Sequence, residues 1–153
     1  MEMEQKADGF YDWFAGFIDG EGCFTIHRNG KNGRWAAARF DLKLRADDAE
    51  IIYAIQRRLG FGIVVMYHPK SDPRFGYSNP QVEFRLAKKT DCLKLVSILD
   101  EHPLRAKKLK DYLIWREAVL LLNTKQYGGY PPSKIHELKQ GLEQVRKYVE
   151  VTK

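Results

Sequence analysis

Cysteine is scarce in this chain, and long hydrophobic runs are missing altogether. Two of its 153 residues, Cys23 and Cys92, are cysteines, too few and too far apart for a disulfide framework or a zinc site. No apolar run reaches the roughly 18 residues that cross a bilayer, and the polar, acidic residues 1–6 do not resemble a signal peptide. These absences favour a soluble intracellular protein without a membrane partner, in either a bacterial cytoplasm or an organelle.

The remaining composition is typical of one globular domain with a positive surface. Hydrophobic residues make up 44% of the chain, and 26 Lys and Arg against 20 Asp and Glu give a formal net charge of +6. We expect a single domain over residues 1–153, with a core at about 10–125 and a helical extension at about 131–150. A positive surplus of this size is compatible with a polyanionic partner but does not identify one.

Helical periodicity marks several segments. Between Phe10 and Ile18, apolar side chains recur with the i, i+3, i+4, i+7 spacing of an amphipathic helix. Similar patterns predict helices at residues 48–59, 93–99 and 107–125. A last helix is expected from residue 133 to about 149, where it either braces the core or reaches along nucleic-acid phosphates.

Period-two alternation, the pattern of a half-buried strand, occurs in two pairs of segments. The first pair is residues 23–29 and 35–45, and the second is residues 63–68 and 81–86. The resulting order predicts an α+β fold in which one four-stranded antiparallel sheet has helices on one face. The other face and the hairpin tips are expected to carry the following polar and charged residues: His27, Asn29, Lys31, Arg34, Arg39, Asp41, Lys43, Arg45, Lys70, Arg74, Gln81, Glu83 and Arg85.

Such a face has the chemistry of a DNA-binding surface. A β-ribbon can enter the major groove, where Arg pairs with guanine, Asn or Gln with adenine, and Asp or Glu with cytosine. The acids Asp41 and Glu83 among the cations indicate either base reading or internal salt bridges. An ordinary solvated sheet face would show the same alternation.

Residues 14–22 combine small, apolar and acidic residues in an unusual way. A helix rich in small residues runs directly into two acids that are bracketed by glycines. The C-terminal end of a helix carries partial negative charge, so two acids there indicate a local cap or a bound cation. The spacing of Ala15, Gly16 and Gly20 lets another helix approach closely, either from a second chain or from the same one.

This motif and the order of the elements resemble the LAGLIDADG homing endonucleases. The nine residues read Phe-Ala-Gly-Phe-Ile-Asp-Gly-Glu-Gly, and they match the family signature at Ala15, Gly16, Ile18, Asp19 and Gly22. The exchanges elsewhere keep apolar, small and acidic character, and the resemblance extends over about residues 10–125. It implies the αββαββα homing-endonuclease fold with additional C-terminal helices. It also implies site-specific hydrolysis of double-stranded DNA with Mg²⁺ as cofactor.

In that family the signature helices of two motifs pack against each other. Because the motif occurs once in this chain, the resemblance implies a homodimer acting on a long pseudo-palindromic site. The expected contact line between the two chains comprises Ala15, Gly16, Asp19 and Gly20.

The resemblance also assigns catalytic roles. Glu21 and the carbonyl of Gly20 would hold the metal, since hard oxygen ligands suit Mg²⁺. Lys107, with Lys108 as a near alternative, would be the basic residue that polarises solvent. The family often has a glutamine where this chain has Leu44. Its expected replacements are Lys43, Arg45, Asp47 and Asp48.

Two other functions are compatible with these patterns. The first is an RNA-splicing maturase, whose partner is intron RNA, or a non-cleaving nucleic-acid-binding protein on the same scaffold. The second is a structural interaction domain whose aromatic first helix mediates dimerisation. Intact acidic and basic residues at positions 21 and 107 favour the nuclease.

Overall fold

The fold follows the predicted order of helices and strands. The computed structural model describes residues 8–29, 35–68, 74, 79–124 and 132–149. Among the described helices, none has the length and apolar character needed to cross a membrane. The elements are α2 (Phe10–Glu21), β1 (Gly22–Asn29), β2 (Trp35–Arg45), the 3₁₀ turn η2 (Ala46–Asp48), α3 (Ala49–Leu59), β3 (Ile63–Tyr67), β4 (Gln81–Leu86), α4 (Lys89–Glu101), α5 (Lys108–Leu122) and α6 (Pro132–Val145).

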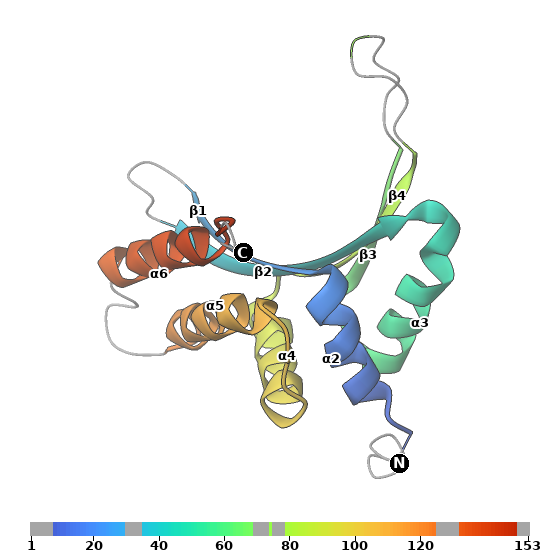
Figure 1. Ribbon diagram of the computed structural model, residues 1–153, viewed down its shortest axis with the longest axis horizontal. Coiled ribbons are helices and arrows are strands. Elements are labelled where there is room, and N and C mark those ends of the chain that lie inside the picture. The colour runs from blue at the N-terminus through green and yellow to red at the C-terminus, as the bar shows by residue number, and fades with distance from the viewer. Residues whose placement is uncertain (1–7, 30–34, 69–73, 75–78, 125–131, 150–153) are drawn as a thin grey trace.

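The four strands form one antiparallel sheet in the order β1-β2-β4-β3. Cys23 lies opposite Asp41, Asp41 lies opposite Arg85, and Arg85 lies opposite Ile63, so these side chains share one face of the sheet. Figure 1 shows α2, α3, α4 and α5 gathered on one side of the curved sheet, with α6 beside β1. The predicted α+β class, with helices on one face, is confirmed.

An aromatic cluster joins the sheet to α5. Phe24, Phe40 and Trp115 are fully buried, and the ring centroids of Phe24 and Trp115 lie 5.0 Å apart. The indole Nε1 of Trp115 also donates a 3.1 Å hydrogen bond to the carbonyl of Arg39 on β2. Because truncating such a buried aromatic costs about 3–5 kcal/mol, α5 is firmly fixed against the sheet.

Gly22 turns the chain directly from α2 into β1. A Cβ atom at this position would lie 2.7 Å from Cγ2 of Ile18 and 3.0 Å from the ring of Phe40. A glycine is therefore required for the helix to end so close to the sheet. This tight junction places Glu21, the last residue of α2, at the margin of the sheet.

Some helix limits differ from those expected. Helix α4 begins at Lys89, four residues before the apolar pattern starts, and α6 ends at Val145. The expected end near residue 149 was wrong because Tyr148 and Val149 extend the apolar pattern without packing, being 84% and 74% exposed. A pattern of residue types shows where burial can occur, but tertiary contacts decide where the helix ends.

Candidate functional site

The C-terminal end of α2 opens onto a surface cavity. Glu21 lines this cavity, both Glu21 and the preceding Gly20 are exposed, and the last carbonyls of a helix have no partners within the helix. The cavity has a volume of about 550 Å³. Its lining comes from the helix end, β2, η2 and β4, and comprises Glu21, Lys43, Leu44, Arg45, Asp47, Asp48 and Gln81.

Gln81 was expected on the sheet face but not as a neighbour of Glu21, the acid expected to bind metal. It lies opposite Arg45 in the β2–β4 register, and this brings it into the cavity that contains Glu21. Leu44 lines the same cavity. The cavity therefore contains a glutamine near Leu44, where the family often has one, but this glutamine comes from β4 and not from β2. Pairing the last residue of β2 with the first residue of β4 would have found it.

Asp19 does not line this cavity. Its Oδ2 accepts a 2.8 Å hydrogen bond from the main-chain N–H of Arg105, and its Oδ1 accepts one of 3.1 Å from that of Ala106. Lys107 is the next residue, so these bonds place the start of α5 beside the end of α2. Lys107 is exposed. The carboxylate of Asp19 is thus engaged within its own chain, and its expected place on the contact line between two chains stays a prediction.

The exposed side of α2 does not include all residues of the expected contact line between two chains. Ala15 is only 4% exposed and belongs to the core of its own chain, so it is not available to a partner. Gly16 and Gly20 are exposed, and an added Cβ would meet nothing within 4 Å at either position. Trp13 is 47% exposed, and its ring stacks on Phe17 at 5.3 Å. The open strip on α2 is therefore Trp13, Gly16 and Gly20.

The donors at the helix end fit a hard divalent cation. The carboxylate of Glu21 and the carbonyl of Gly20 are oxygen ligands, and both residues are exposed. Across the part of the chain that the structure describes, no three His, Cys, Asp or Glu side chains come together as a metal cluster. The described residues of one chain thus offer a carboxylate and a main-chain oxygen, and further ligands would come from phosphates, water or a second chain.

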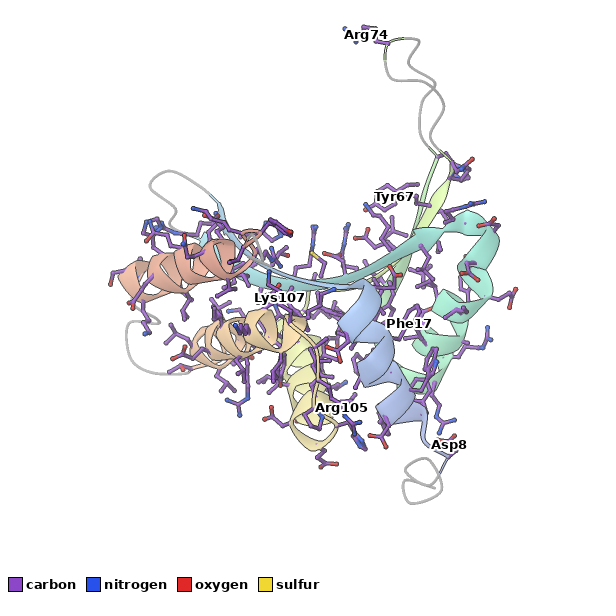
Figure 2. The ribbon with its side chains drawn as sticks, viewed as in Figure 1. Asp8, Phe17, Tyr67, Arg74, Arg105 and Lys107 are labelled. Carbon is purple, nitrogen blue, oxygen red and sulfur yellow. The ribbon has the colours of Figure 1, made fainter. Side chains whose placement is uncertain are left out.

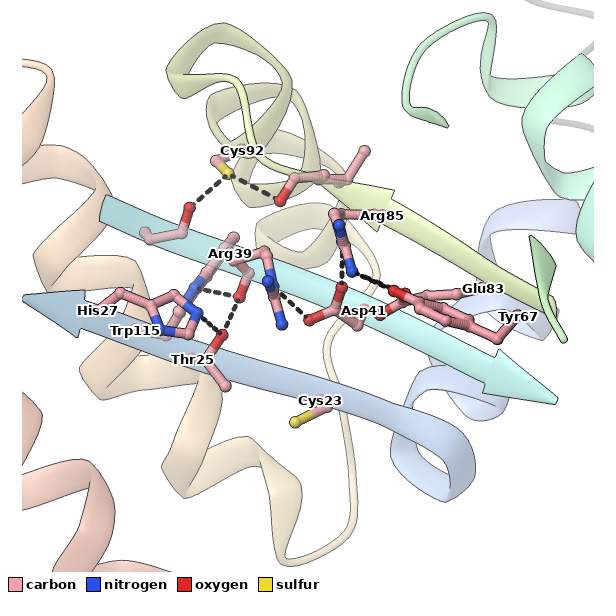
Figure 3. A network of polar contacts seen from close by, with 12 residues as sticks. Cys23, Thr25, His27, Arg39, Asp41, Tyr67, Glu83, Arg85, Cys92 and Trp115 are labelled. Carbon is pink, nitrogen blue, oxygen red and sulfur yellow. Dashed lines mark hydrogen bonds and ion pairs between the residues drawn. The ribbon is translucent and has the colours of Figure 1, made fainter. Parts of the chain in front are cut away.

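A network of ion pairs occupies the middle of the polar sheet face. Asp41 accepts hydrogen bonds from Nε of Arg39 at 2.8 Å and from Nε of Arg85 at 3.1 Å. Glu83 accepts one from Nη2 of Arg85 at 2.8 Å and one from the Tyr67 hydroxyl at 2.5 Å. Figure 3 shows Asp41 lying between the two arginines.

Both acids of this network are buried, Asp41 at 7% and Glu83 at 2% exposure. Burial raises the pKa of Glu83 above its usual range, and the hydrogen bond to Glu83 raises the pKa of Tyr67. Of the two interpretations left open for these acids, the structure supports internal salt bridges. They are not available to accept hydrogen bonds from cytosine, and they hold Arg39 and Arg85 in fixed positions instead.

The other expected DNA-binding residues differ in accessibility. Lys43 and Arg45 are exposed, with Lys43 Nζ 4.7 Å from the ring centroid of Tyr67 and Arg45 paired with Asp47 at 2.6 Å. Arg74 is exposed and lies well beyond the ends of the strands (Figure 2). Gln81 is exposed, while His27, Arg39 and Arg85 are half-buried. Lys31, Arg34, Lys70 and the side chain of Asn29 lie outside the described part of the chain.

His27 lies at the β1 end of the polar face. Its Nε2 is hydrogen-bonded to Oγ1 of Thr25 at 3.2 Å. Burial lowers the pKa of His27 below 6.5, and the positive charges of Arg39, Lys139 and Arg85 lower it further. The imidazole is therefore mainly uncharged at neutral pH, in a region of positive potential that attracts anions.

Comparison with protein families decides the class of this fold. A family model described as LAGLIDADG endonuclease matches residues 14–119. The chain belongs to the LAGLIDADG endonuclease family. The probable intron-encoded endonuclease Cox1-I1b of Schizosaccharomyces pombe is 31% identical over 144 residues, covering 91% of this chain and 35% of that protein. The probable intron-encoded endonuclease 3 of Neurospora crassa is 31% identical over 118 residues, or 74% of this chain and 21% of that protein. This LAGLIDADG chain thus spans at most about a third of either relative.

Solved structures show the same LAGLIDADG homing-endonuclease fold. The homing endonuclease I-TnaI has a TM-score of 0.61 and 25% identity, with 89% of this chain and 97% of that chain covered. I-AabMI bound to uncleaved DNA has a TM-score of 0.67 and 25% identity, with 84% of this chain and 43% of that chain covered. I-SmaMI bound to uncleaved DNA in the presence of calcium ions has a TM-score of 0.70 and 24% identity, with 88% of this chain and 45% of that chain covered.

Proposed function

We propose that this LAGLIDADG protein is a site-specific endonuclease that hydrolyses phosphodiester bonds in double-stranded DNA. The observation that carries the proposal is the exposed Glu21 at the end of α2, in a cavity bordered by the polar sheet face. Side chains that suit phosphates and base edges, Lys43 and Arg45 among them, lie beside this carboxylate. The family membership and the DNA-bound relatives I-AabMI and I-SmaMI support the same conclusion.

Each residue at the helix end has a separate role in this reaction. Glu21 and the carbonyl of Gly20 would hold Mg²⁺, which would supply an activated water and charge neutralisation at the scissile phosphate. Lys107, which Asp19 holds beside the helix end, donates hydrogen bonds to solvent near the phosphate. Gln81 orients solvent within the cavity, at the place where Leu44 offers no polar atom.

The proposed working species is a homodimer. The signature motif occurs once, and the described residues of one chain assemble no three-ligand metal cluster. The open strip of Trp13, Gly16 and Gly20 permits a second α2 to approach closely, since nothing lies within 4 Å of an added Cβ at either glycine. A two-fold dimer would place two Glu21 carboxylates near one symmetry axis and select a long pseudo-palindromic site.

The decisive experiment compares the wild type with Glu21→Gln on a library of duplex sites in the presence of Mg²⁺. Glu21→Gln should abolish cleavage and retain specific binding, because it removes the charge and keeps the shape. Glu50→Gln, an exposed acid on α3, is the matched control and should cleave like the wild type. Wild-type cleavage by Glu21→Gln would refute the metal assignment. Tight binding of intron RNA without cleavage by the wild type would instead identify a maturase.

A further inference from the structure

Helix α6 is fixed against the edge of the sheet by an apolar stripe. Ile135, Leu138 and Leu142 are all buried, and they pack against α5 and β1. On the far side of β1 from the polar face, Nη1 of Arg28 lies 2.6 Å from Nδ1 of His136. Figure 1 shows α6 running alongside β1 and next to α5. These contacts hold the helix in one orientation relative to the sheet.

One cation of this segment contacts the polar face of the sheet, and a second lies on the same side of the segment. Nη2 of Arg146, the residue directly after α6, lies 3.9 Å from Sγ of Cys23. Lys139 lies about two helical turns before Arg146, on the same side of the segment, and its positive charge is among those that lower the pKa of His27. Cys23 and His27 both lie on the polar face of β1, because they alternate with the buried Phe24 and Ile26. The two cations therefore extend this face beyond its β1 edge.

The spacing of the two cations suits one strand of a nucleic-acid duplex. Seven residues separate Lys139 from Arg146, which corresponds to about 10 Å along a helix axis at 1.5 Å per residue. One DNA strand rises about 3.4 Å per nucleotide and also winds around the axis, so successive phosphates lie further apart than the rise alone, and about 10 Å corresponds to fewer than three phosphate steps. Lys139 and Arg146 can thus reach two phosphates of the same strand.

Lys139 and Arg146 form ion pairs within the chain, but these pairs do not prevent them from contacting phosphates. Lys139 Nζ pairs with Glu143 at 2.7 Å on the exposed surface, where such an i,i+4 pair contributes little and can exchange for a phosphate. Arg146 Nε bonds to the mostly buried Asp111 at 3.2 Å. Asp111 therefore anchors the guanidinium at the edge of the sheet while its outer nitrogen faces Cys23.

We propose that Lys139 and Arg146 form a phosphate-binding flank of the sheet, which contacts the backbone of duplex DNA outside the bases that the strands read. The proposal rests on the proposed DNA-binding function and adds a second surface to it. Contacts to phosphates carry no base information, so this flank raises affinity and fixes the position of the duplex without changing sequence preference.

The test measures duplex-DNA binding by the full chain at several salt concentrations, in a Glu21→Gln background to prevent cleavage. Lys139→Gln and Arg146→Gln should each reduce the slope of log affinity against log salt by about 1, and weaken binding equally for different sequences. Lys94→Gln is the matched control, because Lys94 lies on α4 and its Nζ is 5.1 Å from the ring centroid of Phe61. It should leave the slope unchanged.

Arg146→Lys separates binding from folding. If the positive charge binds a phosphate, Arg146→Lys will restore the salt slope. Because a lysine can also pair with Asp111, the second variant is Asp111→Asn, which removes the ion pair but keeps Arg146 and should leave the slope unchanged. Unchanged slopes in Lys139→Gln and Arg146→Gln, with normal wild-type binding, would overturn this flank and leave the proposed function intact. A wild type that binds no duplex DNA would overturn both. If Lys139→Gln and Arg146→Gln change the salt slope of RNA binding but not that of duplex-DNA binding, the flank is not a DNA contact and the proposal is overturned.

Discussion

The carboxylate of Asp19 accepts a hydrogen bond from the main-chain N–H of Ala106, 87 residues further along the chain. With the parallel bond from Arg105, it joins the end of α2 to the segment that enters α5. Glu21 lies two residues after Asp19, and Lys107 follows Ala106 directly. One carboxylate thus determines how the proposed metal ligand and the proposed basic residue stand relative to each other.

Asp19→Ala should therefore impair catalysis more than DNA binding. We expect the single-turnover cleavage rate at saturating DNA to fall at least about tenfold, since misplacing a catalytic group by about 1 Å can cost 100-fold. The free energy of unfolding should fall by about 1–3 kcal/mol, because two main-chain donors lose a charged acceptor. Asp19→Asn keeps one acceptor oxygen, so its cleavage rate and its free energy of unfolding should lie between those of Asp19→Ala and the wild type. Wild-type cleavage by Asp19→Ala would show that Lys107 is positioned in another way.

The open strip on α2 predicts a substitution that separates folding from dimerisation. Gly16→Leu should leave the single chain folded, because no atom lies within 4 Å of an added Cβ, but should weaken self-association in sedimentation experiments. Gly141→Ala is the control, since its Cβ would make an ordinary 3.9 Å contact with Ile114. It should stabilise α6 by up to about 1 kcal/mol and leave association unchanged. If Gly16→Leu associates as the wild type does, the second chain does not dock on this strip.

The buried ion pairs predict two graded losses of stability. Tyr67→Phe removes one hydrogen bond to Glu83 and should lower the free energy of unfolding by about 1 kcal/mol in urea denaturation. Asp41→Ala should cost more, about 3 kcal/mol, because it leaves the half-buried Arg39 and Arg85 without their shared carboxylate. Asp41→Ala should also relax base preference next to these arginines. Equal stability of the two variants would contradict a shared role for Asp41.

The lowered pKa of His27 predicts a pH dependence of DNA binding. Burial and neighbouring cations hold this pKa below 6.5, whereas a bound phosphate would favour the imidazolium and raise it. Binding then takes up a proton, so affinity should rise as the pH falls from 8 to 6. His27→Gln should remove this part of the pH dependence, measured at constant ionic strength. An unaltered pH profile in His27→Gln would place the bound phosphates away from this residue.

Protonation of His27 should have the opposite effect on folding. A folded-state pKa below the unfolded value means that the stabilisation is fully present above about pH 6.5. It is lost as the pH falls through the lower folded-state pKa. Thermal unfolding without DNA should therefore lose this contribution on acidification in the wild type but not in His27→Gln. Binding and folding thus report the same titration with opposite signs.

Local periodicity was sufficient to predict the elements of the sheet. Strand β2 spans residues 35–45 as expected, because its alternating apolar residues pack in the core while the charged ones face away. The position of Glu21 at the end of α2 also follows from the motif, since it depends on the helix and on the glycine that ends it, while its role as a metal ligand stays a prediction. Such features depend on neighbours in sequence, and a pattern within one segment is enough to find them.

The other features depend on residues that are distant in sequence. The bonds of Asp19 to Arg105 and Ala106 follow from the packing of α2 beside the start of α5, which no local pattern encodes. The burial of Asp41 arises because Arg39 and Arg85 on two strands converge on it. Ala15 faces the core because the orientation of a helix is set by its contacts, and small residues on opposite sides look alike in sequence.

The strand order β1-β2-β4-β3 has a consequence for shortened versions of the chain. It leaves β1 at the margin of the sheet, paired with β2, and α6 lies along that margin. An edge strand presents main-chain donors and acceptors that can recruit a strand from another molecule. A chain cut before Pro132 would therefore expose a template for intermolecular β-pairing. Such a fragment would lose activity through aggregation as well as through loss of the phosphate contacts proposed for Lys139 and Arg146.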